Sequence, residues 1–189
     1  MGATVVLAEY DPRWPERYQQ ERQRILHAIG EYVVAIEHIG STAVPGLGAK
    51  PIIDIMVAVR SLARDVPACV EPLRRIGYEH VPRPDFKDSA FFSHGTWGPS
   101  TRHLHLTEFG SAFWNEKLLF RDYLRIHADT AAEYFSLKCS LAARHAANRT
   151  AYTDAKSAFI YSIVNRARSA ALAPRTASAL ASVERRMPR

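Results

Sequence analysis

Cysteine and long apolar runs are both scarce in this sequence of 189 residues. The two cysteines, Cys69 and Cys139, cannot form a disulfide framework, and both fall in expected helices, where we interpret them as small core residues. The apolar stretches are no longer than a strand and are interrupted by charges, which excludes a transmembrane helix. The first residues lack a cationic stretch before an apolar one, so no signal peptide is expected. We therefore expect a cytoplasmic protein with reduced thiols and no membrane partner.

Positive charge is unevenly distributed along the chain, whose net charge is +6. The segment from Arg166 to Arg189 carries +5, which leaves +1 for the first 165 residues. A nucleic-acid groove needs a basic stripe on the folded surface, whereas this excess lies in an Ala/Arg-rich segment. We therefore do not expect a nucleic-acid partner. The sequence predicts one domain, residues 1–170, followed by a C-terminal tail or helix, residues 171–189, and it carries no signal for an oligomeric state.

Hydrophobic periodicity predicts an α+β fold in which most strands precede a helical block. The segments that have the apolar and β-branched pattern of strands are 4–8, 32–39, 51–59, 78–81, 90–94 and 102–107. Helices are expected up to Gly30, from a cap at Asp65 to Gly77, and in a block from Ser111 onward with later caps at Asp129 and Thr150. We expect a mixed, mostly antiparallel sheet of about five strands with packed helices. The C-terminal helical block is expected to cover the site from one side.

A glycine-rich segment, HIGSTAVPGLGAKPIIDIMV, runs from His38 to Val57 and joins two of these strands. Glycine lets a backbone bend close to a ligand. A P-loop would need Gly-Lys-Ser/Thr followed by a helix, but Lys50 follows Ala49 and precedes Pro51. The dinucleotide fingerprint also needs a helix after its glycines. Because a strand follows here, the segment is neither of these two motifs.

A third pattern fits this segment better, namely a Gly-Ser turn followed by a strand that carries an acid. Gly40 and Ser41 form the turn, and twelve residues separate Ser41 from Asp54. The pattern resembles that of the nucleotidyltransferase superfamily of the DNA polymerase β type. Nearly the whole chain to about residue 170 further resembles one family of it, the GrpB-like proteins. The matching stretches are YDPRWP (10–15), EHIGSTAVPGLGAKPIIDIMV (37–57), GY (77–78), HLH (103–105), FRDYL (120–124) and a late helix around Tyr152 and Lys156.

The resemblance implies a nucleotidyltransferase-like fold with a phosphate site at the turn. Gly40, Ser41 and Thr42 would hold phosphate oxygens through their amides and hydroxyls. Lys50 would add a positive charge, unless it is a surface lysine before a proline. Asp54 would be the catalytic acid or the ligand of a divalent metal ion.

The strand after the loop lacks a second acid. Residues two apart in a strand share a face, so Met56 lies where the superfamily has its second carboxylate. A thioether does not hold Mg²⁺, which prefers oxygen ligands. The sequence therefore leaves open whether the chain is an enzyme, namely a metal-dependent nucleotidyltransferase without the usual second Asp.

Two histidines could complete the site. His103 and His105 share one face of an expected strand. With Asp54 they would form a two-histidine, one-carboxylate set, in which they are metal ligands or supply the general base. The other interpretation is that both are polar residues hydrogen-bonded near the edge of the sheet. The cofactor that we expect is a divalent metal ion, Mg²⁺, Mn²⁺ or Zn²⁺, and a nucleoside triphosphate is the candidate substrate.

Three residues of the helical block could also meet a ligand. Arg121 is either an ion-pair partner between helix and sheet or a further phosphate ligand, and Tyr152 and Lys156 either pack between helices or close over the site. We favour a nucleotidyltransferase-like protein that binds or transfers a nucleotide or phosphorylated small molecule through the 40–42 turn and Asp54. The alternative is a non-catalytic accessory or sensor domain that binds a nucleotide or phosphometabolite, because GrpB domains also occur fused to dephospho-coenzyme A kinase.

Overall fold

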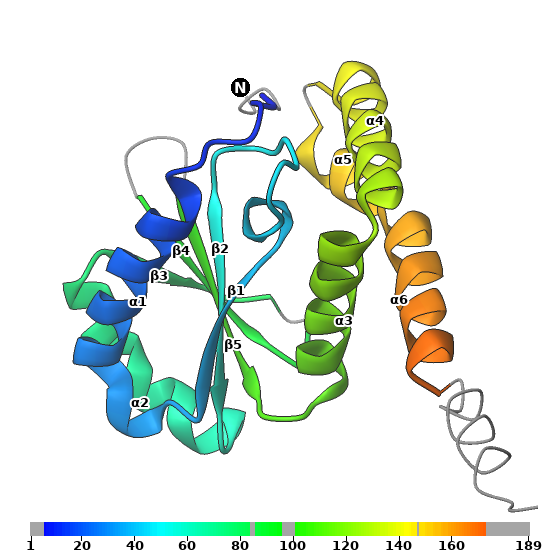
Figure 1. The fold of residues 1–189 in the computed structure, drawn as a ribbon. Coiled ribbons are helices and arrows are strands. Elements are labelled where there is room, and N and C mark those ends of the chain that lie inside the picture. The colour runs from blue at the N-terminus through cyan, green and yellow to red at the C-terminus, as the bar shows by residue number, and fades with distance from the viewer. Residues whose placement is uncertain (1–5, 84–85, 96–100, 147, 173–189) are drawn as a thin grey trace, which may run out of the picture.

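The computed structural model describes residues 6–83, 86–95, 101–146 and 148–172. These residues form one five-stranded sheet with helices on both of its faces (Figure 1). The strands are β1 (Ala35–Ile39), β2 (Ile53–Val59), β3 (Tyr78–Val81), β4 (Ala90–His94) and β5 (Arg102–Glu108). The helices are α1 (Trp14–Ile29), α2 (Leu62–Arg75), α3 (Ala112–Ile126), α4 (Ala128–Arg144), α5 (Arg149–Asp154) and α6 (Ser157–Leu172), with 3-10 turns η1 (Gly30–Tyr32) and η2 (Ser41–Ala43).

The sheet is mixed, as predicted, and its strand order is β1-β2-β5-β4-β3. The β2–β5 pair is parallel, and the other three pairs are antiparallel. The parallel register sets Asp54 beside His103 and Met56 beside His105. The predicted catalytic acid and the predicted histidine pair therefore lie on neighbouring strands.

Five of the six predicted strand segments form strands of this sheet. The sixth, 4–8, lies partly outside the described residues, and Ala8 forms a single bridge with Ala49 through two backbone hydrogen bonds of 2.8 Å. Residues 173–189 of the predicted tail are likewise outside the described part of the chain, and α6 continues to Leu172. The division of the chain at residue 170 stays a prediction.

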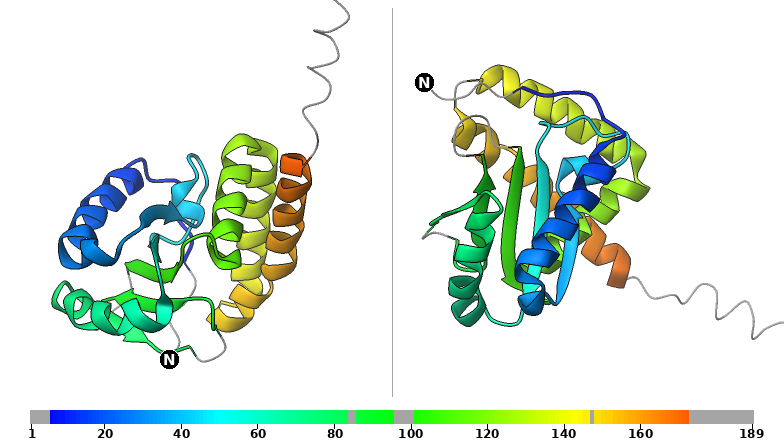
Figure 2. Two further views of the ribbon diagram at one scale, coloured as in Figure 1. Left: turned by 90° about the horizontal axis from the view of Figure 1, so that it is seen from below. Right: turned by 90° about the vertical axis from the view of Figure 1, so that its left-hand side faces the viewer.

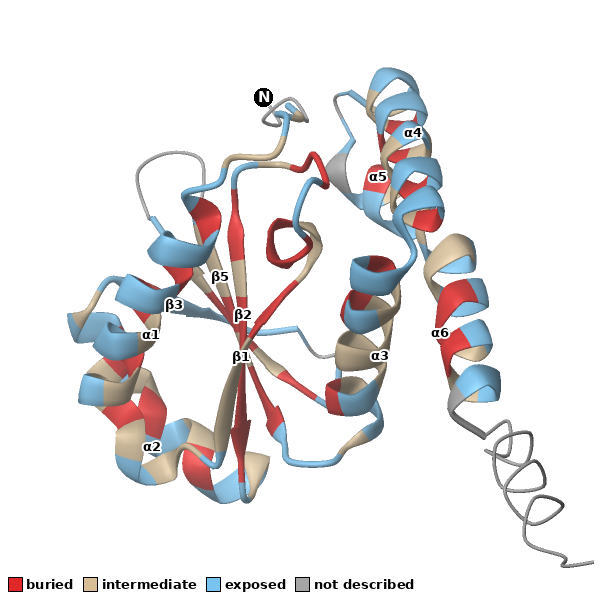
Figure 3. Ribbon diagram, viewed as in Figure 1, coloured by how far each residue is buried: buried red, intermediate tan, exposed pale blue. Residues whose placement is uncertain are grey.

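One face of the sheet is covered by α1 and α2 (Figures 1 and 2). Alternate residues of β2, from Ile53 to Val59, point to this side together with Leu104 and Leu106 of β5. Trp14 at the start of α1 is buried against them. Figure 3 marks buried segments along the strands and along α1 and α2. Because alternate residues of a strand face opposite sides, Asp54, Met56 and the two histidines are left on the other face.

That other face is covered by α3, and α4–α6 lie beyond it on the same side (Figure 2). Met56 and Ala58 of β2 pack against Trp114 of α3 and are fully buried. A further cluster around Leu124 and Tyr134 joins α3 to α4. The helical block is thus on the side of Asp54, as predicted.

Several helix starts predicted from the sequence are wrong. Helix α2 begins at Leu62, and Asp65 instead accepts hydrogen bonds from the amides of Arg60 and Ser61 (3.1 and 3.0 Å). Helix α4 begins before Asp129, and the region expected to be one last helix is split into α5 and α6.

Cys69 is buried as expected, but Cys139 is exposed, so its interpretation as a core residue is wrong. Within the described residues, no helix is long and apolar enough to cross a membrane.

Candidate functional site

The turn after β1 brings its backbone against the predicted acid. Gly40 has a φ of 71°, a conformation that residues with a side chain rarely adopt. A β-carbon at this position would lie 2.5 Å from Oδ2 of Asp54. Glycine is therefore required at this position for two reasons, its backbone angle and the close approach of the Asp54 carboxylate.

Thr42 is buried beneath the turn rather than facing outward. Its hydroxyl donates to the Ile52 carbonyl (3.2 Å) and accepts from Nε2 of His38 (3.0 Å). His38 is itself buried and stacks on Tyr18, with 4.7 Å between ring centroids. Burial lowers the pKa of His38 to about 4, so the ring is neutral and carries its proton on Nε2. The Thr42 side chain thus fixes the turn to the start of β2.

Asp54 and His103 form a hydrogen-bonded pair across β2 and β5. The Nδ1 of His103 lies 2.9 Å from Oδ1 of Asp54, and the two side chains are 18% and 30% exposed. Burial alone would raise the pKa of Asp54, but the His103 hydrogen bond and the nearby His105 and Lys50 outweigh it and the pKa is lowered. The carboxylate is therefore ionised, and Nδ1 of His103 must be the donor.

His105 lies one step further along β5, beside Met56. Its ring packs against Phe91 and Phe113, with centroids 5.0 and 5.6 Å away, and its Nδ1 is buried without a hydrogen-bond partner among the described residues. Burial lowers the pKa of His105 to about 3, which keeps the ring neutral. Across the described part of the chain, no three His, Cys, Asp or Glu side chains converge to hold a metal ion.

Four lysines from separate elements lie around Asp54 and the 40–42 turn. They are Lys50 in the loop before β2, Lys117 of α3, Lys138 of α4 and Lys156 just before α6. Burial lowers the pKa of Lys117, and it lowers that of Lys156 to about 8 with help from Lys50 and Lys117; Asp54 opposes both shifts. Lys117 and Lys156 therefore interact electrostatically with Asp54, and Lys156 also interacts with Lys50 and Lys117.

Lys138 contacts the turn directly. Its ammonium donates to Oγ of Ser41 (3.1 Å) and to the Gly48 carbonyl. Burial, followed by the charges of Lys156 and Lys50, lowers its pKa to about 7. Sequence reasoning missed Lys138, although a lysine between Tyr134 and Leu141 on the buried stripe of a helix is an unusual position that signals a special role.

Two of the other lysines share one aromatic ring. The ammonium groups of Lys156 and Lys50 lie 4.4 and 5.6 Å from the ring centroid of Tyr152. Tyr152 is buried between α5 and the rest of the helical block, where it clusters with Leu141. Tyr152 thus packs between helices, as one of the two interpretations had it, and its ring contacts both ammonium groups. That Tyr152 and Lys156 close over a ligand stays a prediction.

Arg121 is buried and links α3 to β1. Its guanidinium donates to Oε2 of Glu37 (2.6 Å), to the His38 carbonyl (3.0 Å) and to Asp122 (2.7 Å). The predicted ion pair between helix and sheet is present. These contacts place Arg121 as a support of the strand that leads into the turn.

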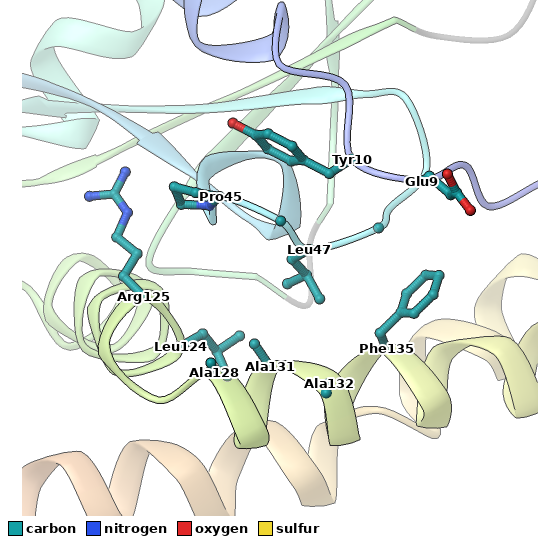
Figure 4. A pocket seen from close by; sticks show the side chains of 12 residues that line it. Glu9, Tyr10, Pro45, Leu47, Leu124, Arg125, Ala128, Ala131, Ala132 and Phe135 are labelled. Atoms are coloured by element: carbon teal, nitrogen blue, oxygen red, sulfur yellow. The ribbon is translucent and has the colours of Figure 1, made fainter.

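A separate cavity of about 560 Å³ lies between residues 45–48 and the α3–α4 corner (Figure 4). Tyr10 and Leu47 line one side of it, Phe135 and the alanines of α4 line another, and Arg125 lies at one end. Phe135 leaves no room for a side chain at Gly48, where a β-carbon would lie 2.4 Å from its ring. Neither Asp54, His103 nor the four lysines line this cavity.

The fold that carries this site is of the nucleotidyltransferase-like class. It matches a crystal structure of Cid1 poly(U) polymerase described as bound to Mg and 3′-dATP, with a TM-score of 0.52 over 80% of this chain and 49% of that one. At 16% identity this likeness shows the fold alone.

The chain belongs to the GrpB family, whose family model, "GrpB protein", matches residues 4–166. The crystal structure of the conserved protein GrpB from Enterococcus faecalis has a TM-score of 0.79 and 34% identity, covering 86% of this chain and 96% of that one. A UPF0157 protein of Streptomyces coelicolor is 42% identical over 165 residues, which are 87% of this chain and 84% of the relative. The resemblance found in the sequence is thereby confirmed.

Proposed function

We propose that this protein binds a nucleotide or another phosphorylated small molecule at the 40–42 turn and acts on it through Asp54 and His103. The observation that carries this proposal is the hydrogen bond from the buried ammonium of Lys138, which lies near Lys50 and Lys156, to Ser41 of the turn. A lysine buried beside other lysines is unfavourable without an anion, and phosphate oxygens would supply the missing charge and hydrogen-bond acceptors. The nucleotidyltransferase-like fold supports the same assignment.

His103 is the group that we assign to proton transfer. The ionised Asp54 holds the proton of the ring on Nδ1 and leaves Nε2 to accept another one. In the proposed step an acceptor hydroxyl forms a bond to phosphorus as its proton passes to Nε2 of His103. The bond from phosphorus to the leaving phosphate breaks, and the ammonium groups of the lysines stabilise the negative charge that this phosphate gains. A positioned general base of this kind contributes about 10²- to 10⁴-fold to a rate.

The donors in the site do not match a magnesium centre. Asp54 is a single carboxylate, Met56 occupies the face position of the second one, and His105 is not directed with them onto one point among the described residues. The proposed step therefore uses no metal ion. The metal role predicted for Asp54, His103 and His105 stays a prediction, which the following experiment tests with added ions.

The test is to incubate the purified protein with labelled nucleoside triphosphates in EDTA and with Mg²⁺, Mn²⁺ or Zn²⁺, and to measure pyrophosphate release and self-labelling. We expect turnover that falls about 10²-fold or more in His103→Gln, with nucleotide binding retained. His27→Gln, which changes an exposed histidine of α1, is the matched control and should behave as the wild type.

Two results would contradict the proposal. Binding without turnover under any metal condition, unchanged in Asp54→Asn, would remove the enzymatic part and leave the accessory or sensor domain. Absence of nucleotide and pyrophosphate binding under every condition would remove the proposal entirely.

A further inference from the structure

Among the described residues, the site holds more positive than negative charge. Lys50, Lys117 and Lys156 lie near Asp54, and Lys138 lies near Lys50 and Lys156 and donates to Ser41. In the described part of the chain, Glu116 is the other acid near Lys117, and it forms an ion pair with Arg168 at 2.7 Å. Nearby divalent cations would be repelled by this excess of ammonium groups, whereas anions would be attracted.

The site also lacks the donors that would overcome this repulsion. Mg²⁺ needs several oxygen ligands in an octahedral arrangement. The position beside Asp54 on the same face is taken by Met56, which is fully buried between Ile39, Ala58 and Trp114. His103 directs Nδ1 at Asp54 itself, so this carboxylate oxygen already has a hydrogen-bond donor.

We propose that the site binds a diphosphate or triphosphate group as the metal-free anion, with Lys50, Lys138 and Lys156 in place of the divalent cations that a metal-dependent nucleotidyltransferase uses. This inference rests on the proposed function and specifies how its ligand is held. Asp54 then serves to orient His103 instead of binding a metal ion.

The number and placement of the lysines indicate the length of the phosphate chain. Lys138 reaches the turn at Ser41, while Lys50 and Lys156 both lie near the ring of Tyr152. A single phosphate carries a charge of about −2 at neutral pH. It would leave part of this cluster uncompensated, whereas two or three linked phosphates can contact lysines from the loop, α4 and the start of α6 together.

The test is isothermal titration calorimetry of the full chain with inorganic pyrophosphate, orthophosphate and ATP, in EDTA and then in excess Mg²⁺. We expect pyrophosphate and ATP to bind in EDTA, at least about tenfold more tightly than orthophosphate. Excess Mg²⁺ should weaken both, because it neutralises the phosphate charge that the lysines recognise.

Variants separate the lysines from a general charge effect. Lys156→Gln should weaken pyrophosphate binding about tenfold or more, and Lys138→Met should do the same if its urea midpoint shows that it folds. Lys87→Met, which changes an exposed lysine after β3, should bind as the wild type does.

The possible failures are distinct. Binding that is absent in EDTA and restored by Mg²⁺ would overturn the metal-free site and leave the proposed function intact. Equal affinity for orthophosphate and pyrophosphate would overturn the assigned chain length. No binding of any of the three probes, with or without Mg²⁺, would overturn the proposed function as well.

Discussion

Gly40 meets two demands that only a residue without a side chain can satisfy, and they can be measured separately. Gly40 and Gly46 both have positive φ angles, 71° and 78°, but a β-carbon at Gly46 has nothing within 4 Å. Gly46→Ala should therefore show only the backbone cost, about 1 kcal/mol of unfolding free energy. Gly40→Ala adds a clash with Asp54 and should cost about 3 kcal/mol. Urea unfolding of both variants measures the difference.

The same pair of variants tests whether Gly40 positions the carboxylate. Displacing Asp54 breaks its hydrogen bond to His103, so Gly40→Ala should also lose turnover while Gly46→Ala keeps it. Equal destabilisation of the two variants would show that the close approach to Asp54 is not what requires glycine.

At the scale of elements, Arg121 links α3 to β1 through its hydrogen bonds to the Glu37 carboxylate and the His38 carbonyl. Arg121→Met would leave the buried His38 carbonyl without this donor and Glu37 without its partner. Because Glu37 is 38% exposed and can be hydrated, we expect a loss of about 2–3 kcal/mol rather than the cost of a fully buried pair. Arg168→Met breaks the exposed pair with Glu116 and should cost about 0.5 kcal/mol or less. Thermal and urea unfolding compare them; similar values would contradict a supporting role for Arg121.

Strands are the elements whose contribution to the site could be predicted from the sequence. Alternation alone put Asp54 and Met56 on one face of β2 and His103 and His105 on one face of β5, and the structure confirms both. The period of two is local and fixed by the backbone, so it needs no knowledge of tertiary packing.

The site lysines that lie on helices could not be predicted from the sequence. Lys117 reaches Asp54 and Lys138 reaches Ser41 only because α3 and α4 pack on one side of the sheet, and this packing depends on contacts far apart in the chain. Thr42 was assigned to phosphate by its place in the turn, but its hydroxyl is directed inward by His38 and Ile52. Side-chain direction inside a 3-10 turn does not follow from residue spacing.

For the whole molecule, the buried lysines couple ligand binding and stability to pH in opposite directions. The pKa of Lys138 is about 7 and that of Lys156 about 8 in the folded protein, against 10.5 in an unfolded chain. Above these values the folded state has released protons that the unfolded state still binds. Stability should therefore rise with pH from 7, by up to about 1.4 kcal/mol per pH unit for each fully titrating lysine. The affinity for pyrophosphate should fall over the same range, because the anion needs the ammonium form.

Urea unfolding and calorimetry between pH 7 and pH 9 measure both slopes on the same preparation. The window ends at pH 9 because the buried Cys69, whose pKa burial raises to about 11, begins to lower stability where the unfolded thiol titrates. Lys138→Met should flatten the rise in stability, since it removes one of the lysines whose pKa is lowered in the folded protein, whereas Lys87→Met should retain the full slope. A wild-type stability that falls with pH in this window would mean that the lysines are already paired with anionic groups in the free protein. In that case their positive charge would not be available to a phosphate chain.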